Sequence, residues 1–109
     1  MSQTTRDRPH RLESKADLDD LLAAHDRVLV EFHTEGCSMC AAMVPVLGAV
    51  AKVSDVPVAT MNPRDDPHLV AEYAVRSVPK LLLFEDGELV KTLEDGFVRI
   101  EGVLSFIGD

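Results

Sequence analysis

The sequence contains few of the residues on which several classes of protein depend. It has two cysteines, one tyrosine and no tryptophan among its 109 residues. Two cysteines are too few for a secreted scaffold held together by disulfides. No apolar run approaches the roughly 20 residues that a membrane-spanning helix needs, and residues 1–9 lack the apolar stretch of a secretory signal. We therefore expect a cytoplasmic protein that does not enter a membrane.

Basic residues are also scarce. There are 11 lysines and arginines against 19 acidic residues, which gives a formal net charge of −8. Since nucleic acids and anionic membranes attract basic surfaces, neither is an expected partner. Hydrophobic residues make up 46% of the chain. At this length they suffice for one hydrophobic core, so folding requires neither a metal nor a disulfide.

Apolar patterning predicts alternating helices and strands after a short polar segment. Residues 1–11 show no periodicity and are expected to form a flexible arm, whereas residues 12–109 are expected to form one domain. Ser14 is a predicted helix cap. Helices are predicted at residues 15–25, 38–53, 68–74 and 98–107, and strands at residues 28–33, 56–61, 80–84 and 89–93.

The order of these elements predicts the fold class. Strand–helix–strand units favour parallel pairing, whereas Asp86-Gly87 is typical of a two-residue hairpin between antiparallel strands. We therefore expect an α/β fold with a central mixed sheet of four to five strands and helices on both faces. Pro45 falls within a predicted helix that is almost entirely apolar and is expected to kink it.

Cys37 and Cys40 form a C-x-x-C motif between a predicted strand and a predicted helix. Free N–H groups at a helix N-terminus favour the thiolate of the first cysteine. The second cysteine lies one turn further on the same face, within bridging distance. The motif therefore predicts that Cys37 attacks a substrate disulfide and that Cys40 resolves the mixed disulfide.

Several segments at compatible spacing resemble the thioredoxin family. Residues 28–40 are similar to the strand that runs into the active-site helix of that family, and Pro45 matches its helix-kinking proline. Residues 76–84 resemble the segment that holds its cis-proline. Asp86-Gly87 is similar to the hairpin that follows, and Gly96 to a glycine beyond the last strand. The resemblance implies a thioredoxin-like fold and a thiol–disulfide oxidoreductase that needs no cofactor.

The resemblance also implies roles for residues near the cysteines. Pro79 is expected to have a cis peptide bond packed against the cysteine pair, and Val78 to offer its backbone to an extended substrate. Ser38 and Met39 are expected to contact substrates, Met39 as an exposed apolar side chain; the alternative is a Met39 side chain that packs inward. Glu31 stands where the family often carries a buried aspartate, and there it would take the proton of the resolving cysteine through a water. The alternative is a glutamate on the solvated face of its strand.

The chain departs from the family pattern at several positions. His33 and Gly36 replace the two tryptophans that usually flank the first cysteine, and Thr60 replaces a lysine partner of the buried acid. Lys80 stands where threonine is usual. A positive charge on His33 or Lys80 would favour the Cys37 thiolate, but we expect both side chains on a solvated rim. These departures leave open the redox potential and the electron donor.

The leading hypothesis is a monomer that reduces or exchanges disulfides of client proteins and is itself reduced by a thioredoxin-reductase-type donor. A second hypothesis is a module that handles Zn or Cu(I) through Cys37 and Cys40, with His33 as a third ligand. Two thiolates are only half of a tetrahedral zinc site. A third hypothesis is a binding module that has kept the fold without efficient turnover.

Overall fold

The computed structural model describes residues 8–108 and places five strands in one mixed sheet. The strands lie in the order β1-β3-β2-β4-β5. The elements along the chain are β1 (His10–Leu12), α1 (Lys15–Ala24), β2 (Arg27–Phe32), α2 (Ser38–Val53), β3 (Val58–Met61), the 3₁₀ turn η2 (Pro63–Asp65), α3 (His68–Glu72), β4 (Lys80–Glu85), β5 (Glu88–Leu93) and α4 (Ile100–Ile107).

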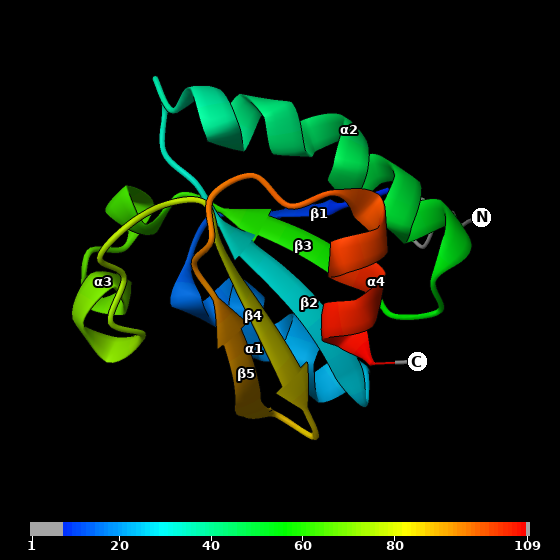
Figure 1. Ribbon diagram of the computed structural model, residues 1–109. Coiled ribbons are helices and arrows are strands. Elements are labelled where there is room, and N and C mark those ends of the chain that lie inside the picture. The colour runs from blue at the N-terminus through cyan, green and yellow to red at the C-terminus, as the bar shows by residue number, and fades with distance from the viewer. Residues whose placement is uncertain (1–7, 109) are drawn as a thin grey trace.

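The sheet combines a parallel and an antiparallel half, as predicted. Strand β3 lies between β1 and β2 and is parallel to both, because helical segments carry the chain back between them. Strand β4 runs antiparallel to β2, and β5 antiparallel to β4. Helices α2 and α4 cover one face of the sheet, and α1 and α3 cover the other (Figure 1). The predicted fold class is therefore confirmed.

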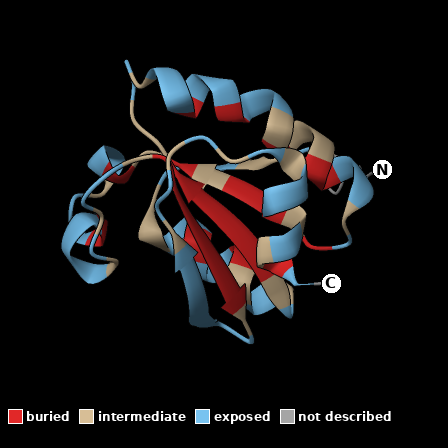
Figure 2. Cartoon of the chain, in the orientation of Figure 1, coloured by how far each residue is buried: buried red, intermediate tan, exposed pale blue. Residues whose placement is uncertain are grey.

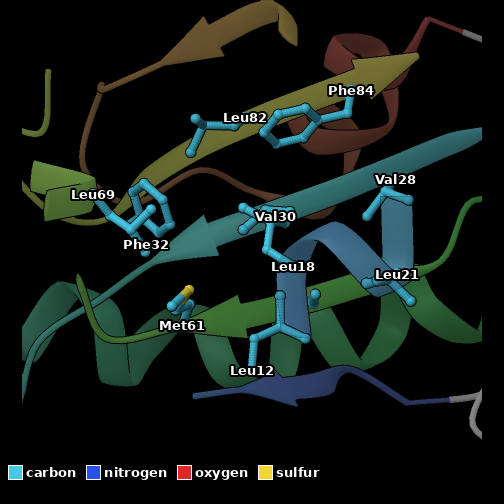
Figure 3. Packing of buried hydrophobic residues seen from close by; sticks show 11 residues of the cluster. Leu12, Leu18, Leu21, Val28, Val30, Phe32, Met61, Leu69, Leu82 and Phe84 are labelled. Carbon is cyan, nitrogen blue, oxygen red and sulfur yellow. The ribbon is translucent and has the colours of Figure 1, made fainter. Parts of the chain in front are cut away.

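The central strand β2 supplies both halves of the core because successive side chains of a strand point to opposite faces. Val28, Val30 and Phe32 pack with residues of α1 and α3, as Figure 3 shows. Leu29 packs with residues of α2 and α4 instead. Strands β2, β3 and β4 are buried for most of their length, whereas the edge strand β5 is exposed (Figure 2). By the same alternation, Glu31 belongs to the face that α2 covers.

Strand β1 was not expected from the sequence. His10 and Arg11, placed in the flexible arm by their lack of periodicity, pair with Ala59 and Thr60 of β3. Three residues are too few to show a pattern, and the pairing partner is distant in the chain. Residues 1–7 of the expected arm lie outside the described residues.

The local signals for the other elements hold with small shifts at their ends. The Ser14 side chain accepts a hydrogen bond of 3.1 Å from the Asp17 N–H and caps α1 as predicted. Helix α2 has the predicted bounds and contains Pro45. The Asp86-Gly87 turn joins β4 to β5 with positive φ at both residues. No helix within residues 8–108 is long and apolar enough to span a bilayer.

Candidate active site

The two cysteines lie at the N-terminus of α2 and form a disulfide with a Cα–Cα distance of 5.2 Å. Cys37 is the N-cap of the helix, and its Sγ accepts a hydrogen bond of 3.1 Å from the Cys40 N–H. Cys37 is partly buried, whereas Cys40 is buried. The sulfur that an incoming molecule can reach is therefore that of Cys37.

The peptide bond between Val78 and Pro79 is cis, as expected, and lies beside the disulfide. The carbonyl oxygen of Val78 is 3.9 Å from Cys37 Sγ. Pro79 is buried and Val78 is partly buried. The segment before β4 therefore borders the more accessible sulfur with a backbone carbonyl.

Ser38 and Met39 occupy the first turn of α2, and both are exposed. The Met39 side chain is 48% exposed and lies against Gly96, where an added Cβ would come within 3.0 Å of the Met39 Sδ. The next residue, Phe97, is also exposed. The loop between β5 and α4 thus forms a second border of the site.

A pocket of about 480 Å³ opens behind the disulfide and extends to Glu31. Glu31 is 2% exposed, and its Oε2 atom has no hydrogen-bond partner among the described residues. Burial raises the pKa of this carboxyl to about 7. The alternative position on a solvated face is therefore wrong. The pocket is lined by Pro9, Arg11, Glu31, His33, Thr34, Glu35, Gly36, Cys37, Cys40, Ala41, Val44, Leu47 and Thr60.

Two residues of the neighbouring chain segments shape the surroundings of Glu31. Thr60 pairs in register with Glu31 from β3 and also lines the pocket. Arg11, which the sequence placed in the arm, reaches the pocket from β1. Sequence reasoning missed Arg11 because its position depends on the pairing of β1 with β3.

His33 lines the pocket with both cysteines and is partly buried. Burial, with a smaller contribution from Arg11, lowers its pKa below the ordinary value of 6.5. The imidazole is therefore neutral at neutral pH.

The prediction that Lys80 lies on a solvated rim is wrong. The residue is 5% exposed and belongs to the face of β4 opposite that of Leu81, which packs against α2 and α4. Its Nζ donates hydrogen bonds to the carbonyl oxygens of Tyr73 and Ala74 and pairs with Glu94 at 2.8 Å. The ammonium therefore points away from the disulfide.

The arrangement suits dithiol chemistry better than metal binding. Within residues 8–108, no group of three or more His, Cys, Asp and Glu side chains is placed to hold a metal ion. Cys37 and Cys40 are instead within disulfide distance of each other. The metal-handling hypothesis is therefore not favoured.

Comparisons with known proteins agree with this geometry. The family model described as Thioredoxin matches residues 10–107. Thioredoxin of Porphyra purpurea is 40% identical over 68 residues, which are 61% of this chain and 64% of that protein. Thioredoxin Y1, chloroplastic, of Arabidopsis thaliana is 33% identical over 95 residues, which are 81% of this chain and 55% of that protein. The matches thus span less than two thirds of the length of either relative.

Solved structures extend the similarity to the whole fold. A mutant thioredoxin of Halobacterium salinarum superposes with a TM-score of 0.89 at 30% identity and covers 96% of this chain and 92% of its own. The thioredoxin of Fasciola hepatica gives a TM-score of 0.80 at 23% identity, covering 90% of this chain and 95% of its own. The match to the family model includes both cysteines, Glu31 and the cis-proline segment. The chain belongs to the thioredoxin family.

Proposed function

We propose that this chain is a thiol–disulfide oxidoreductase that reduces or exchanges disulfides of client proteins. The observation that carries the proposal is the Cys37–Cys40 pair at the N-terminus of α2, beside the cis peptide bond of Val78-Pro79. A partly accessible sulfur, a buried second sulfur and a neighbouring backbone carbonyl are the parts that this chemistry requires. No bound cofactor takes part in the scheme.

The reaction begins with the reduced dithiol. The Cys37 thiolate attacks one sulfur of the client disulfide, which forms a mixed disulfide and releases the other client sulfur as a thiolate. The Cys40 thiolate then attacks Cys37 Sγ, releases the second client sulfur and forms the Cys37–Cys40 disulfide. The client gains two electrons and the protein loses two. The Cys40 N–H at the Cys37 sulfur favours the attacking thiolate.

Glu31 is the proposed proton acceptor for Cys40. Both residues line the pocket behind the disulfide, and the unpartnered Oε2 of Glu31 is available to a water molecule there. A carboxyl with a pKa of about 7 exchanges protons readily at neutral pH. This arrangement lets Cys40 become a thiolate while the client covers the front of the site.

The proposed client-binding residues surround Cys37 on its exposed side. The Val78 backbone would pair with an extended client segment in the manner of an added strand. The cis peptide bond at Pro79 would hold Val78 beside the Cys37 sulfur. Met39 offers an apolar contact and Ser38 lies next to it on the first turn of α2. Recognition through backbone and apolar contacts suits clients of varied sequence.

The catalytic cycle needs a source of electrons. We propose a thioredoxin-reductase-type donor, a reducing compartment such as the cytoplasm, and a monomeric active form. The acidic surface disfavours nucleic acid as a partner. The proposed direction, reduction of clients, depends on a compartment whose reduction potential is lower than that of the Cys37–Cys40 pair.

The test is reduction of insulin disulfides by dithiothreitol in the presence of the protein. The native protein should accelerate the reaction, and Cys37→Ser should abolish the acceleration. Reduced Cys40→Ser, mixed with insulin after dithiothreitol has been removed, should accumulate a mixed disulfide that mass spectrometry detects. If the native protein is no faster than Cys37→Ser, the proposed function is wrong. A Cys40→Ser protein that forms no mixed disulfide would contradict the assigned order of attack.

A further inference from the structure

Lys80 holds a fully partnered ammonium group inside the protein. Its three N–H donors meet three acceptors: the carbonyl oxygens of Tyr73 at 2.9 Å and Ala74 at 3.1 Å, and Glu94 at 2.8 Å. The side chain is 6% exposed. A buried charge is tolerated only when it is paired and hydrogen-bonded. These contacts therefore hold three segments together: the start of β4, residues 73–74 and the loop that carries Glu94.

Glu94 is the link between Lys80 and the loop that joins β5 to α4. Its carboxylate accepts a hydrogen bond from the Lys80 side chain, and the charge and backbone N–H of Arg76 also act on it. Together these groups lower the pKa of Glu94 below its usual value, the Lys80 hydrogen bond having the largest effect. Glu94 thus contacts the segment that runs into Val78 as well as the strand that follows it.

The joined segments are the two that border the disulfide. The carbonyl oxygen of Val78 lies 3.9 Å from Cys37 Sγ, two residues before Lys80. Gly96 lies against Met39, two residues after Glu94. Residues 76–79 therefore border Cys37, and residues 94–97 border Met39, two residues further along α2. The ion pair connects these two borders from within the protein, and neither partner touches a cysteine.

We propose that Lys80 and Glu94 are positioning residues that hold residues 76–79 and 94–97 at the separation that a client protein needs. The inference rests on the proposed function and adds to it a basis for selecting proteins over small disulfides. A protein must fit between both borders, whereas a small disulfide needs only the partly accessible sulfur of Cys37. The ion pair thus acts on client capture and leaves the thiol chemistry to Cys37 and Cys40.

The experiment compares two substrates with matched variants. Lys80→Met keeps the length of the side chain and removes all three donors, and Glu94→Ala removes the acceptor in the exposed loop. Glu85→Ala is the control, because Glu85 pairs with Arg27 at 3.3 Å near the other end of β4. The substrates are insulin and the small neutral bis(hydroxyethyl) disulfide. The KM and kcat of each variant are measured with each substrate, at a temperature well below that at which the variant unfolds.

For insulin, we expect Lys80→Met to raise KM about tenfold while kcat changes less than about twofold, since misplaced contacts weaken binding more than the thiol step. Glu94→Ala should act in the same direction. Because the ion pair is the contact that both residues share, the double variant should lose less than the sum of the losses of the two single variants. Neither variant should alter the rate with the small disulfide by more than about twofold. The Glu85→Ala control should match the native protein on both substrates.

Two results would overturn the inference. One is a folded Lys80→Met protein with the native KM for insulin, and the other is an equal loss of rate on both substrates. If Lys80→Met does not fold, Glu94→Ala decides by the same criteria. Failure of the native protein itself on both disulfides would contradict the proposed function instead.

Discussion

Glu31 of β2 and Cys40 of α2 line the same pocket, and the Oε2 of Glu31 has no hydrogen-bond partner among residues 8–108. The alternation of β2 directs Glu31 to the face that α2 covers, and Cys40 is buried on that side of the helix. A carboxyl that gives up its hydration without a partner resists ionisation. The same feature that costs stability therefore makes Glu31 suitable for proton exchange with Cys40.

The first prediction concerns stability and pH. The Glu31 carboxyl titrates at about 7 in the folded protein, against an ordinary value of 4.5. Between these two values the folded state binds more protons than the unfolded state, so the free energy of unfolding falls as pH rises. The loss amounts to roughly 3 kcal/mol once pH exceeds the folded value.

Denaturant unfolding of the native protein and of Glu31→Gln at several pH values measures this contribution. Other groups cancel in the comparison of the two proteins. The variant should become progressively more stable than the native protein from pH 4.5 to about 7, and the difference should then level off. If the difference in the free energy of unfolding between the two proteins stays constant over this pH range, Glu31 does not titrate as its burial implies.

The second prediction concerns the resolving step. Glu31 must be ionised to accept the Cys40 proton, so the rate at which a mixed disulfide is resolved should rise as pH passes about 7. Glu31→Gln should lose this rise and slow the step about tenfold or more at neutral pH. Stopped-flow measurement of client thiol release gives the rate. Glu35→Gln, an exposed carboxyl at the same pocket, should behave like the native protein.

The third prediction concerns the end of α3. Ala74 has a φ of 51°, in the left-handed region that favours glycine, and its side chain is exposed. Ala74→Gly should therefore raise the free energy of unfolding by about 0.5–1 kcal/mol. Ala71→Gly, an exposed change inside α3, should lower it by about 1 kcal/mol. Thermal unfolding distinguishes the two variants. If both have a lower free energy of unfolding than the native protein, the backbone argument is wrong.

The fourth prediction separates backbone strain from side-chain contact at two glycines. Gly36 and Gly96 have φ values of 82° and 78°. An added Cβ at Gly36 meets nothing within 4 Å, whereas at Gly96 it lies 3.0 Å from the Met39 Sδ. Each change to alanine should cost about 1–2 kcal/mol through φ. If Gly96→Ala lowers the free energy of unfolding more than Gly36→Ala does, the additional loss should disappear when Met39→Ala is combined with it. An additional loss that remains in the combined variant would show that contact with Met39 is not its cause.

Local patterns in the sequence determined most of the elements. Helix α2 begins at Ser38 and ends at Val53 as predicted, because the motif at Cys37 and the apolar run after it are contiguous signals. The Asp86-Gly87 turn was equally local, since it joins adjacent strands. The cis peptide bond at Pro79 followed from resemblance to the thioredoxin family and is present.

Only the tertiary structure decided which distant segments contact one another. Strand β1 exists because His10 and Arg11 pair with β3, some fifty residues further along the chain. Lys80 is buried because Tyr73 and Ala74, which follow α3, and Glu94 supply acceptors for its ammonium. The sequence by itself determined the two sulfurs and the helix that carries them. Their surroundings depend on long-range packing, which sets the desolvation of Glu31 and the partners of Lys80, and no local pattern encodes either.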